Sequence, residues 1–209
     1  MLLEVLPVGA LQANCYIIGC DKTKQAFIID PGDEPEKILA AVRSLGVTVA
    51  GILLTHGHAD HIGAASAVKK SLNCPVYIHP EDSAMLTDSK LNLSSFLGRD
   101  TVLEAPDHTL TDGQGLHAGE MELTVAHTPG HTAGGVCFIA NGVIFSGDTL
   151  FAGSIGRTDL PGGEMETLIA SIKNKLLVLP DETRVYPGHG PLTTIGEEKR
   201  NNPFLNEDW

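Results

Sequence analysis

Residues 55–61 read Thr55-His56-Gly57-His58-Ala59-Asp60-His61 and follow directly on the apolar run 49–54. Three imidazoles and one carboxylate thus lie close together, and neutral imidazole and carboxylate are ligands that suit Zn, Fe and Mn. A turn at the end of a buried strand can aim all four side chains inward. Without a metal, this packing would leave several buried polar groups unpaired. The stretch predicts a metal site; the alternative is a solvated polar loop.

The 209 residues are enough for one sizeable α/β domain with a real core, so we predict a single domain over residues 1–209. The net charge is −12 with 14 Lys and Arg, which argues against a nucleic-acid partner. We find no charged-then-apolar leader and no apolar run long enough to span a bilayer. We therefore expect a cytoplasmic protein with no membrane partner.

The four cysteines contain no Cys-x-x-Cys pair, and most lie in or beside apolar segments. This pattern is typical of small buried apolar side chains in a reducing compartment. We expect none of them to bind metal: Cys15, Cys20, Cys74 and Cys137.

The hydrophobic pattern predicts strands followed by helices in each half of the chain, which favours an α/β helix–sheet–sheet–helix sandwich. Asn141-Gly142 predicts a type I′ hairpin turn. Residues 88–106 are the least regular, and we expect a mobile loop near a site. Strands are expected over residues 2–8, 14–18, 25–30, 49–54, 75–79, 120–126, 136–140, 143–146 and 184–186, and helices over 35–45, 62–72 and 164–177, with a helix start at 80–83.

Three further polar residues follow predicted strands, and each is preceded by glycine: His131, Asp148 and His189. Glycine lets the chain turn sharply beside a crowded centre. By analogy with open α/β sheets, ligands at several strand ends indicate one shared site at a sheet edge. The set then holds five His and two Asp. A catalytic zinc needs about three protein ligands, so this set suits two metals about 3.5–4 Å apart that share one carboxylate.

Thr-His-x-His-x-Asp-His with the later Gly-His, Gly-Asp and Gly-His elements resembles the metallo-β-lactamase superfamily. Order and spacing are most similar to its glyoxalase II-type hydrolases, over nearly the whole chain. The resemblance implies the metallo-β-lactamase fold, an αββα sandwich of two mixed sheets. It assigns His56, His58 and His131 to a first metal and Asp60, His61 and His189 to a second, with Asp148 bridging.

The resemblance also implies a hydroxyacylglutathione hydrolase-like enzyme that cleaves a small thioester, such as an S-acyl glutathione, through a metal-bridging hydroxide. Asp60 would orient that hydroxide and move a proton. We expect two divalent metal ions, zinc before iron or manganese, and a small acyl compound as partner. The oligomeric state stays open.

Two departures from the family pattern bear on the substrate. In the two-zinc antibiotic-hydrolysing class a Cys commonly occupies the Asp148 position, which argues against β-lactam hydrolysis here. Glyoxalase II proper carries a helical carboxy-terminal domain that helps bind glutathione, whereas only about 20 residues follow His189. The sequence therefore favours a thioester and leaves glutathione recognition open.

Arg157 lies in the stretch that follows Asp148, where glyoxalase II-like enzymes place a basic residue that meets the substrate carboxylate. Its guanidinium can form a bidentate pair, so Arg157 is a candidate substrate-binding residue. The alternative is an internal salt bridge with Asp159.

Two other functions remain open. Persulfide dioxygenases of the same superfamily use one Fe(II), which His56, His131 and Asp148 would hold here. A non-catalytic metal protein is the third possibility, although structural zinc sites are usually closed and four-coordinate. The remaining histidines have no ligand-like neighbours in the sequence and are expected at the surface or hydrogen-bonded: His79, His108, His117 and His127. Tyr186 is expected in the core, and residues 202–205 as a segment that docks for packing.

Overall fold

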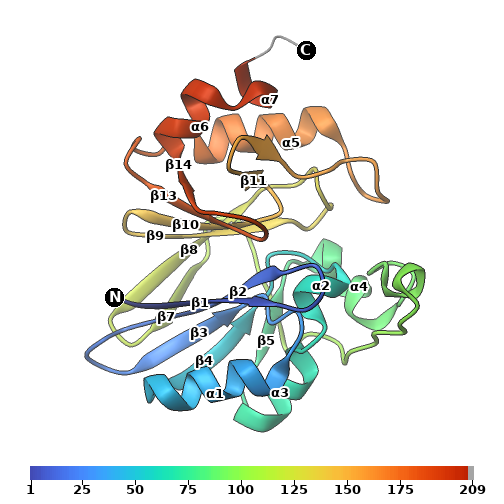
Figure 1. Cartoon of the computed structure of the whole chain (residues 1–209), viewed down its shortest axis with the longest axis vertical. Coiled ribbons are helices and arrows are strands. Elements are labelled where there is room, and N and C mark those ends of the chain that lie inside the picture. Colours follow the sequence, from blue (N-terminus) through green and yellow to red (C-terminus); the bar gives the residue numbers. More distant parts are fainter. Residues whose placement is uncertain (207–209) are drawn as a thin grey trace.

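The computed structural model describes residues 1–206, so the last three residues of the predicted domain lie outside the described part. Two six-stranded mixed sheets face each other, and helices cover both outer surfaces (Figure 1). The predicted αββα sandwich is confirmed.

The first sheet has the order β1-β2-β3-β4-β5-β6. The β1, β2 and β3 strands pair antiparallel, whereas β3 to β6 run parallel. A parallel pair needs a crossover, and α1 (Pro35–Leu45) and α3 (Ala65–Leu72) supply crossovers on the outer face of this sheet. The strands are β1 (Leu2–Val8), β2 (Ala13–Gly19), β3 (Gln25–Ile29), β4 (Thr48–Leu53), β5 (Val76–Ile78) and β6 (His108–Thr109).

The α1 helix (Pro35–Leu45) shows how local sequence sets these bounds. Pro35 occupies its first turn, where no backbone donor is needed. Ile38, Leu39 and Val42 form its buried stripe. Gly46 ends the helix in the left-handed region, with φ +62°, as the sequence predicted.

The second sheet has the order β14-β13-β10-β9-β8-β7. The β10 and β13 strands pair parallel and the other neighbouring strands pair antiparallel, and α5 with the π-helical turn η3 crosses from β10 to β13. The strands are β7 (Gly115–Ala118), β8 (Met121–His127), β9 (Val136–Ala140), β10 (Val143–Gly147), β13 (Arg184–Pro187) and β14 (Thr193–Thr194), and the covering elements are α5 (Met165–Ser171), η3 (Ile172–Leu176) and α6 (Ile195–Asn201).

Three apolar clusters fill the layers. One lies between the sheets and contains Phe138, Phe145 and Tyr186, so the core position predicted for Tyr186 is confirmed. The other two lie under the helices of each outer face. In the carboxy-terminal segment Leu205 is buried and Asn202 donates to the Ser154 carbonyl at 3.0 Å, as expected for a docking segment.

Two predicted elements differ in detail. The helix expected over 62–72 is two pieces, α2 (Ala59–Ile62) and α3 (Ala65–Leu72). They separate at Gly63, where a Cβ would lie 2.4 Å from the Gly32 carbonyl oxygen. The type I′ turn is wrong, because φ is positive at Gly142 (+79°) and not at Asn141.

The connecting segments contain several short elements: β5 is followed by η1 (Pro80–Asp82), α4 (Ser83–Thr87) and η2 (Ser94–Leu97), and the second half holds β11 (Leu150–Phe151), β12 (Ser154–Ile155) and α7 (Pro203–Asn206). Residues 88–106 are mostly irregular, as expected. Within the described residues, every helix falls short of the length and apolar character that a bilayer crossing requires.

Candidate metal centre

Three imidazoles gather beyond the carboxyl ends of β4 and β8. His56, His58 and His131 each offer a nitrogen within 4.8 Å of the other two, and all three are buried. His131 Nε2 lies 3.0 Å from His58 Nδ1. These are the residues that the family resemblance assigned to a first metal.

The second predicted set also comes together. Asp60 and His61 lie in the single turn of α2, and His189 follows β13. His189 Nε2 lies 3.1 Å from Asp60 Oδ2 and 3.3 Å from His61 Nε2. A Cβ on Gly188 would lie 2.2 Å from Asp148 Oδ1, which explains why glycine precedes His189.

Asp148 belongs to neither three-residue group, but its carboxylate contacts both. Its Oδ2 lies 3.7 Å from His131 Nε2 and 3.8 Å from His189 Nε2, and its Oδ1 lies 3.4 Å from His61 Nε2. A carboxylate between two ligand sets is the arrangement that a shared, bridging ligand needs.

Hydrogen bonds on the far side of the rings assign the tautomers. Thr55 Oγ1 donates to Asp30 Oδ2 at 2.6 Å, so it accepts from His56 Nδ1 at 3.1 Å. His61 Nδ1 donates to the same Asp30 oxygen at 3.0 Å. Both imidazoles therefore present an unprotonated Nε2 to the centre when neutral.

The backbone orients two more rings in the same way. His131 Nδ1 donates to the Arg157 carbonyl at 2.7 Å, and His189 Nδ1 donates to the Leu11 carbonyl at 3.1 Å. Metal-binding histidines usually carry such a partner on the second ring nitrogen.

The structure also shows whether the unprotonated nitrogens and carboxylate oxygens suit a bound cation. In the first group, His131 Nε2 carries a lone pair 3.0 Å from His58 Nδ1, a nitrogen that can either donate to it or join it as a second metal ligand. Among the described residues, His56 Nε2 and Asp148 Oδ1 are buried atoms without a hydrogen-bond partner. A buried polar atom of this kind requires an explanation, and a bound metal supplies one.

The charges of the two groups differ. Burial, and then the neighbouring imidazoles, hold the pKa of His56 well below its usual value and lower the pKa of His58 to about 3. Burial also opposes charge on His61, but Asp148, Asp60 and Asp30 outweigh it and raise the pKa of His61 to about 10. The second group therefore demands positive charge, from a proton or from a divalent cation.

Two acidic residues that support the centre were missed from the sequence. Asp30, at φ +49° directly after β3, orients His61 and, through Thr55, His56. Asp82 accepts from the Gly57 N–H at 3.1 Å and the Gly134 N–H at 2.7 Å, so it joins the loops that carry His58 and His131. The position of Asp30 at a strand end, before Pro31-Gly32, was a usable signal; Asp82 offered none.

Arg157 forms the internal salt bridge that the sequence left as the alternative. Its Nε and Nη2 donate to Asp159 at 2.7 and 2.8 Å, and the side chain is exposed. It nevertheless lines the pocket above the predicted metal ligands. Its established contact with the centre is through its carbonyl oxygen, on His131.

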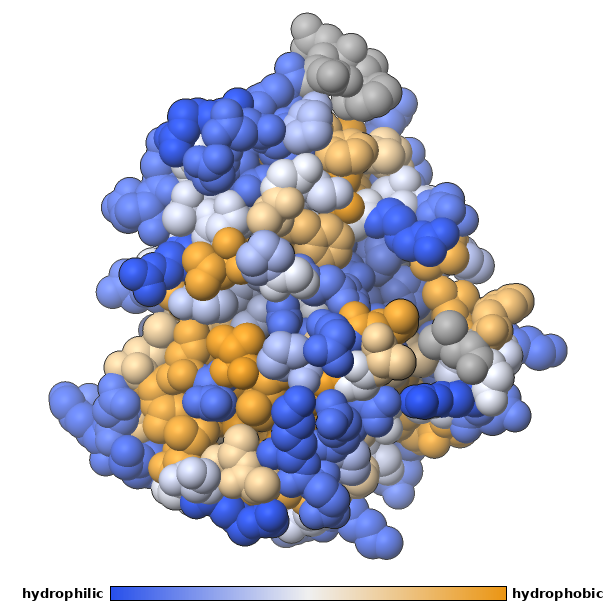
Figure 2. Space-filling view, viewed as in Figure 1, coloured by the Kyte–Doolittle hydropathy of each residue, from blue (hydrophilic) through white to orange (hydrophobic). Residues whose placement is uncertain are grey.

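This pocket, here called the metal pocket, has a volume of about 550 Å³ and opens onto ligands of both groups. Its other walls are mainly apolar and include Leu11, Phe96 and Leu160. Figure 2 shows a recess between the two halves of the molecule with apolar side chains beside it. The expectation that residues 88–106 lie near a site is confirmed, because Phe96 lines this pocket.

The predictions for the cysteines and for the other histidines hold with one exception. All four cysteines are buried and free, as expected. His79 and His127, however, do have a ligand-like neighbour, Glu81. Their rings stack at 4.0 Å and 12°, so their in-plane lone pairs do not converge on one ion.

The profile of the metallo-β-lactamase superfamily matches residues 8–189. The chain belongs to the metallo-β-lactamase superfamily. The hydroxyacylglutathione hydrolase GloC of Haemophilus influenzae is 42% identical to it over 99% of each chain. The BLEG-1 B3 metallo-β-lactamase is 45% identical with a TM-score of 0.94 (99% and 100% of the two chains), and TTHA1623 in a di-iron-bound form is 43% identical with a TM-score of 0.87 (97% and 100%).

A fourth similar protein is more distant in sequence. ETHE1 from Myxococcus xanthus is 30% identical, with a TM-score of 0.82, over 100% of this chain and 86% of its own. Membership of the superfamily supports a metal-dependent hydrolase, and the His and Asp groups provide sites for divalent metals.

Proposed function

We propose that this protein is a two-metal hydrolase of small thioesters of the S-acyl glutathione class. The observation that carries the proposal is the pair of complete ligand groups with Asp148 between them, under one open pocket. The likeness to a protein named hydroxyacylglutathione hydrolase supports the substrate class, and the likeness to a di-iron-bound structure supports two metals.

When bound, two divalent ions supply Lewis acidity: they polarise a carbonyl oxygen and make water acidic near neutral pH. His56, His58 and His131 would hold one ion, Asp60, His61 and His189 the other, and Asp148 both. Since imidazole and carboxylate accept Zn, Fe and Mn, zinc is our first choice and iron the second.

Asp60 has the position of a proton-handling group. It lines the metal pocket, and His61 and His189 outweigh burial to hold the pKa of Asp60 below its usual range, so it is a carboxylate at neutral pH. We propose that it takes a proton from the attacking water as the C–O bond forms and passes that proton to the thiolate as the C–S bond breaks. The apolar walls of the metal pocket would hold the acyl group and exclude water from the reacting carbonyl.

The rival dioxygenase uses one metal on His56, His131 and Asp148, and therefore does not need the second group. His189→Ala separates the two functions, because it removes one ligand of the second group. The hydrolase hypothesis expects about two metals per chain in the wild type, and a loss of thioester hydrolysis of about 100-fold or more in the variant.

The measurement is metal content of protein purified without added metal, followed by anaerobic cleavage of S-acetylglutathione and oxygen uptake on glutathione persulfide. One iron per chain, with oxygen uptake that survives His189→Ala, would overturn the proposal in favour of the dioxygenase. A β-lactam belongs in the same panel, since BLEG-1 is named a metallo-β-lactamase; cleavage of the β-lactam alone would also overturn it.

A further inference from the structure

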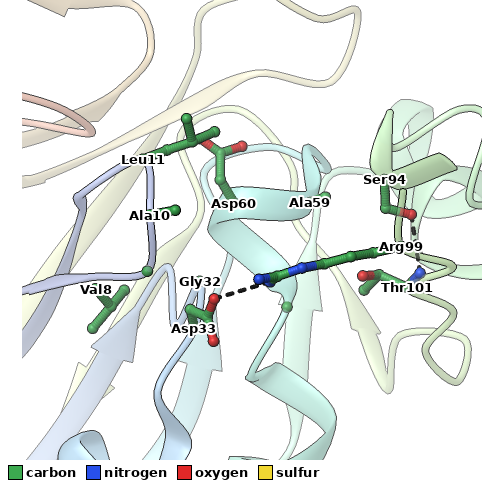
Figure 3. A pocket seen from close by; sticks show the side chains of 12 residues that line it. Val8, Ala10, Leu11, Gly32, Asp33, Ala59, Asp60, Ser94, Arg99 and Thr101 are labelled. Carbon is green, nitrogen blue, oxygen red and sulfur yellow. Dashed lines mark hydrogen bonds and ion pairs between the residues drawn. The ribbon is translucent and has the colours of Figure 1, made fainter. Parts of the chain in front are cut away.

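A second cavity of about 240 Å³ lies beside the metal pocket, and Leu11, Ala59 and Asp60 line both. A substrate whose reacting carbonyl lies at the metal ligands can therefore extend past Leu11 into this cavity without leaving the protein. Figure 3 shows Leu11 and Asp60 on one side of the cavity and Arg99 on the other.

The cavity holds one pair of opposite charges from distant parts of the chain. Arg99 Nη1 donates to Asp33 Oδ2 at 3.1 Å, and Figure 3 shows the arginine reaching across to the aspartate. Both side chains are accessible, at 66% and 37% exposure. An ion pair this exposed contributes little to folding stability.

The Arg99–Asp33 ion pair can still form hydrogen bonds with a ligand. Among contacts within the described residues, Arg99 uses only Nη1, which leaves Nε–H and the Nη2 hydrogens for a ligand. The Glu34 N–H and Arg99 hold the pKa of Asp33 below its usual range, so both charges are present at neutral pH.

The charges select the ligand. Asp33 and Asp60 would repel a simple anion bound at Arg99, and Arg99 would repel a simple cation bound at Asp33. Neither kind of ion pairs with both charges of the cavity. An α-amino acid head complements both, with its carboxylate on the planar guanidinium and its ammonium on Asp33.

We propose that this cavity binds the α-amino acid head of the γ-glutamyl residue of a glutathione thioester, with Arg99 on the α-carboxylate and Asp33 on the α-ammonium. The inference rests on the proposed function. About eight covalent bonds, roughly 10 Å when extended, separate the thioester carbonyl from the α-carbon of the γ-glutamyl residue, so such a ligand can reach across the wall that the two cavities share.

Three thioesters with the same acetyl group test the proposal: S-acetylglutathione, its N-glutaryl analogue without the α-ammonium, and S-acetyl-N-acetylcysteamine without the head. Arg99→Ala is expected to lower kcat/KM for S-acetylglutathione about tenfold more than for the cysteamine thioester, mainly through KM, as for a lost charge-assisted bond. Asp33→Asn should remove the preference for S-acetylglutathione over the N-glutaryl analogue.

Lys22→Ala is the matched control, because it removes an exposed ion pair, with Glu120 at 2.9 Å, outside both cavities. It should leave all substrate ratios unchanged. Equal losses on all three thioesters in Arg99→Ala would show that the arginine acts only on the fold, and would overturn the proposal.

Calorimetric binding of S-methylglutathione, a thioether that cannot be hydrolysed, separates this inference from the proposed function. Binding that weakens about tenfold in Arg99→Ala, with no thioester cleavage by the wild type, would overturn the function and support the cavity. Wild-type cleavage of all three thioesters with equal kcat/KM would support the function and overturn the cavity.

Discussion

Asp82→Ala is expected to lower both the stability and the metal affinity of the protein. Asp82 is 1% exposed and accepts three hydrogen bonds, from the Gly57 N–H, the Gly134 N–H and the Thr132 hydroxyl, the last at 2.8 Å. Gly57 lies between two predicted ligands, and Thr132 follows a third. The carboxylate thus fixes both loops of the first ligand group.

The magnitude follows from the three donors that lose their acceptor. At about 1–1.5 kcal/mol each, the loss is about 3–4.5 kcal/mol. Burial raises the pKa of Asp82, which means that the buried charge itself is unfavourable. Removing this charge therefore offsets about 1 kcal/mol of the lost stability. We expect a net loss of about 2–3.5 kcal/mol, against about 5–15 kcal/mol for the total unfolding free energy of a typical domain.

Urea unfolding of the metal-free protein at pH 7 measures the stability, and competition with a chelator measures metal affinity. Affinity should fall about 10–100-fold, as for other residues that orient metal ligands. Asp88→Ala is the control, because Asp88 also accepts a backbone bond, from Lys90 N–H at 2.8 Å, but is exposed. Unfolding free energy and metal affinity in Asp82→Ala that both match the control would refute the reasoning.

Three further outcomes are expected. Gly188→Ala should cost at least about tenfold in metal affinity, measured by chelator competition, because the added Cβ would lie 2.2 Å from Asp148 Oδ1. Removal of metal should lower the melting temperature seen by circular dichroism, and re-addition should restore it, since a ligand that binds only the native state stabilises it. Lys69 and the Val76 N–H outweigh burial and lower the pKa of Asp107 in the native protein. The ionised Asp107 therefore stabilises the fold above its unfolded-state pKa, and this stabilisation is lost as the pH falls through its native-state pKa. Asp107→Asn should therefore cost at most about 1 kcal/mol in urea unfolding at pH 7, and less near pH 2.

The ligand positions were predictable because each depends on a local pattern. A polar residue after an apolar strand, with glycine before it, fixes where the side chain emerges, and parallel or crossing strands bring such ends together. The α1 helix was predicted to the residue for a similar reason: its buried stripe, Pro35 and Gly46 all lie within one segment.

The supporting residues were not predictable in this way. Asp82 acts on Gly57, 25 residues away, and on Gly134, 52 residues away, so nothing near it in sequence marks its role. The break between α2 and α3 likewise depends on the close approach of Gly63 to the Gly32 carbonyl. Such features arise from tertiary packing, which overrides a helical pattern that looks continuous.

Asp30 links the two ligand groups from outside. Its Oδ2 oxygen accepts hydrogen bonds from Thr55 Oγ1 and from His61 Nδ1. Thr55 Oγ1 in turn accepts a hydrogen bond from His56 Nδ1. His56 belongs to the first group and His61 to the second, and their ring centroids lie 4.2 Å apart. A change of charge on either ring alters the hydrogen bonding of the same Asp30 carboxylate. The two ligand groups are therefore coupled through Asp30 on the side away from the centre and through Asp148 at the centre. The heptapeptide that joins His56 to His61 is for this reason one electrostatic unit rather than two adjacent half-sites.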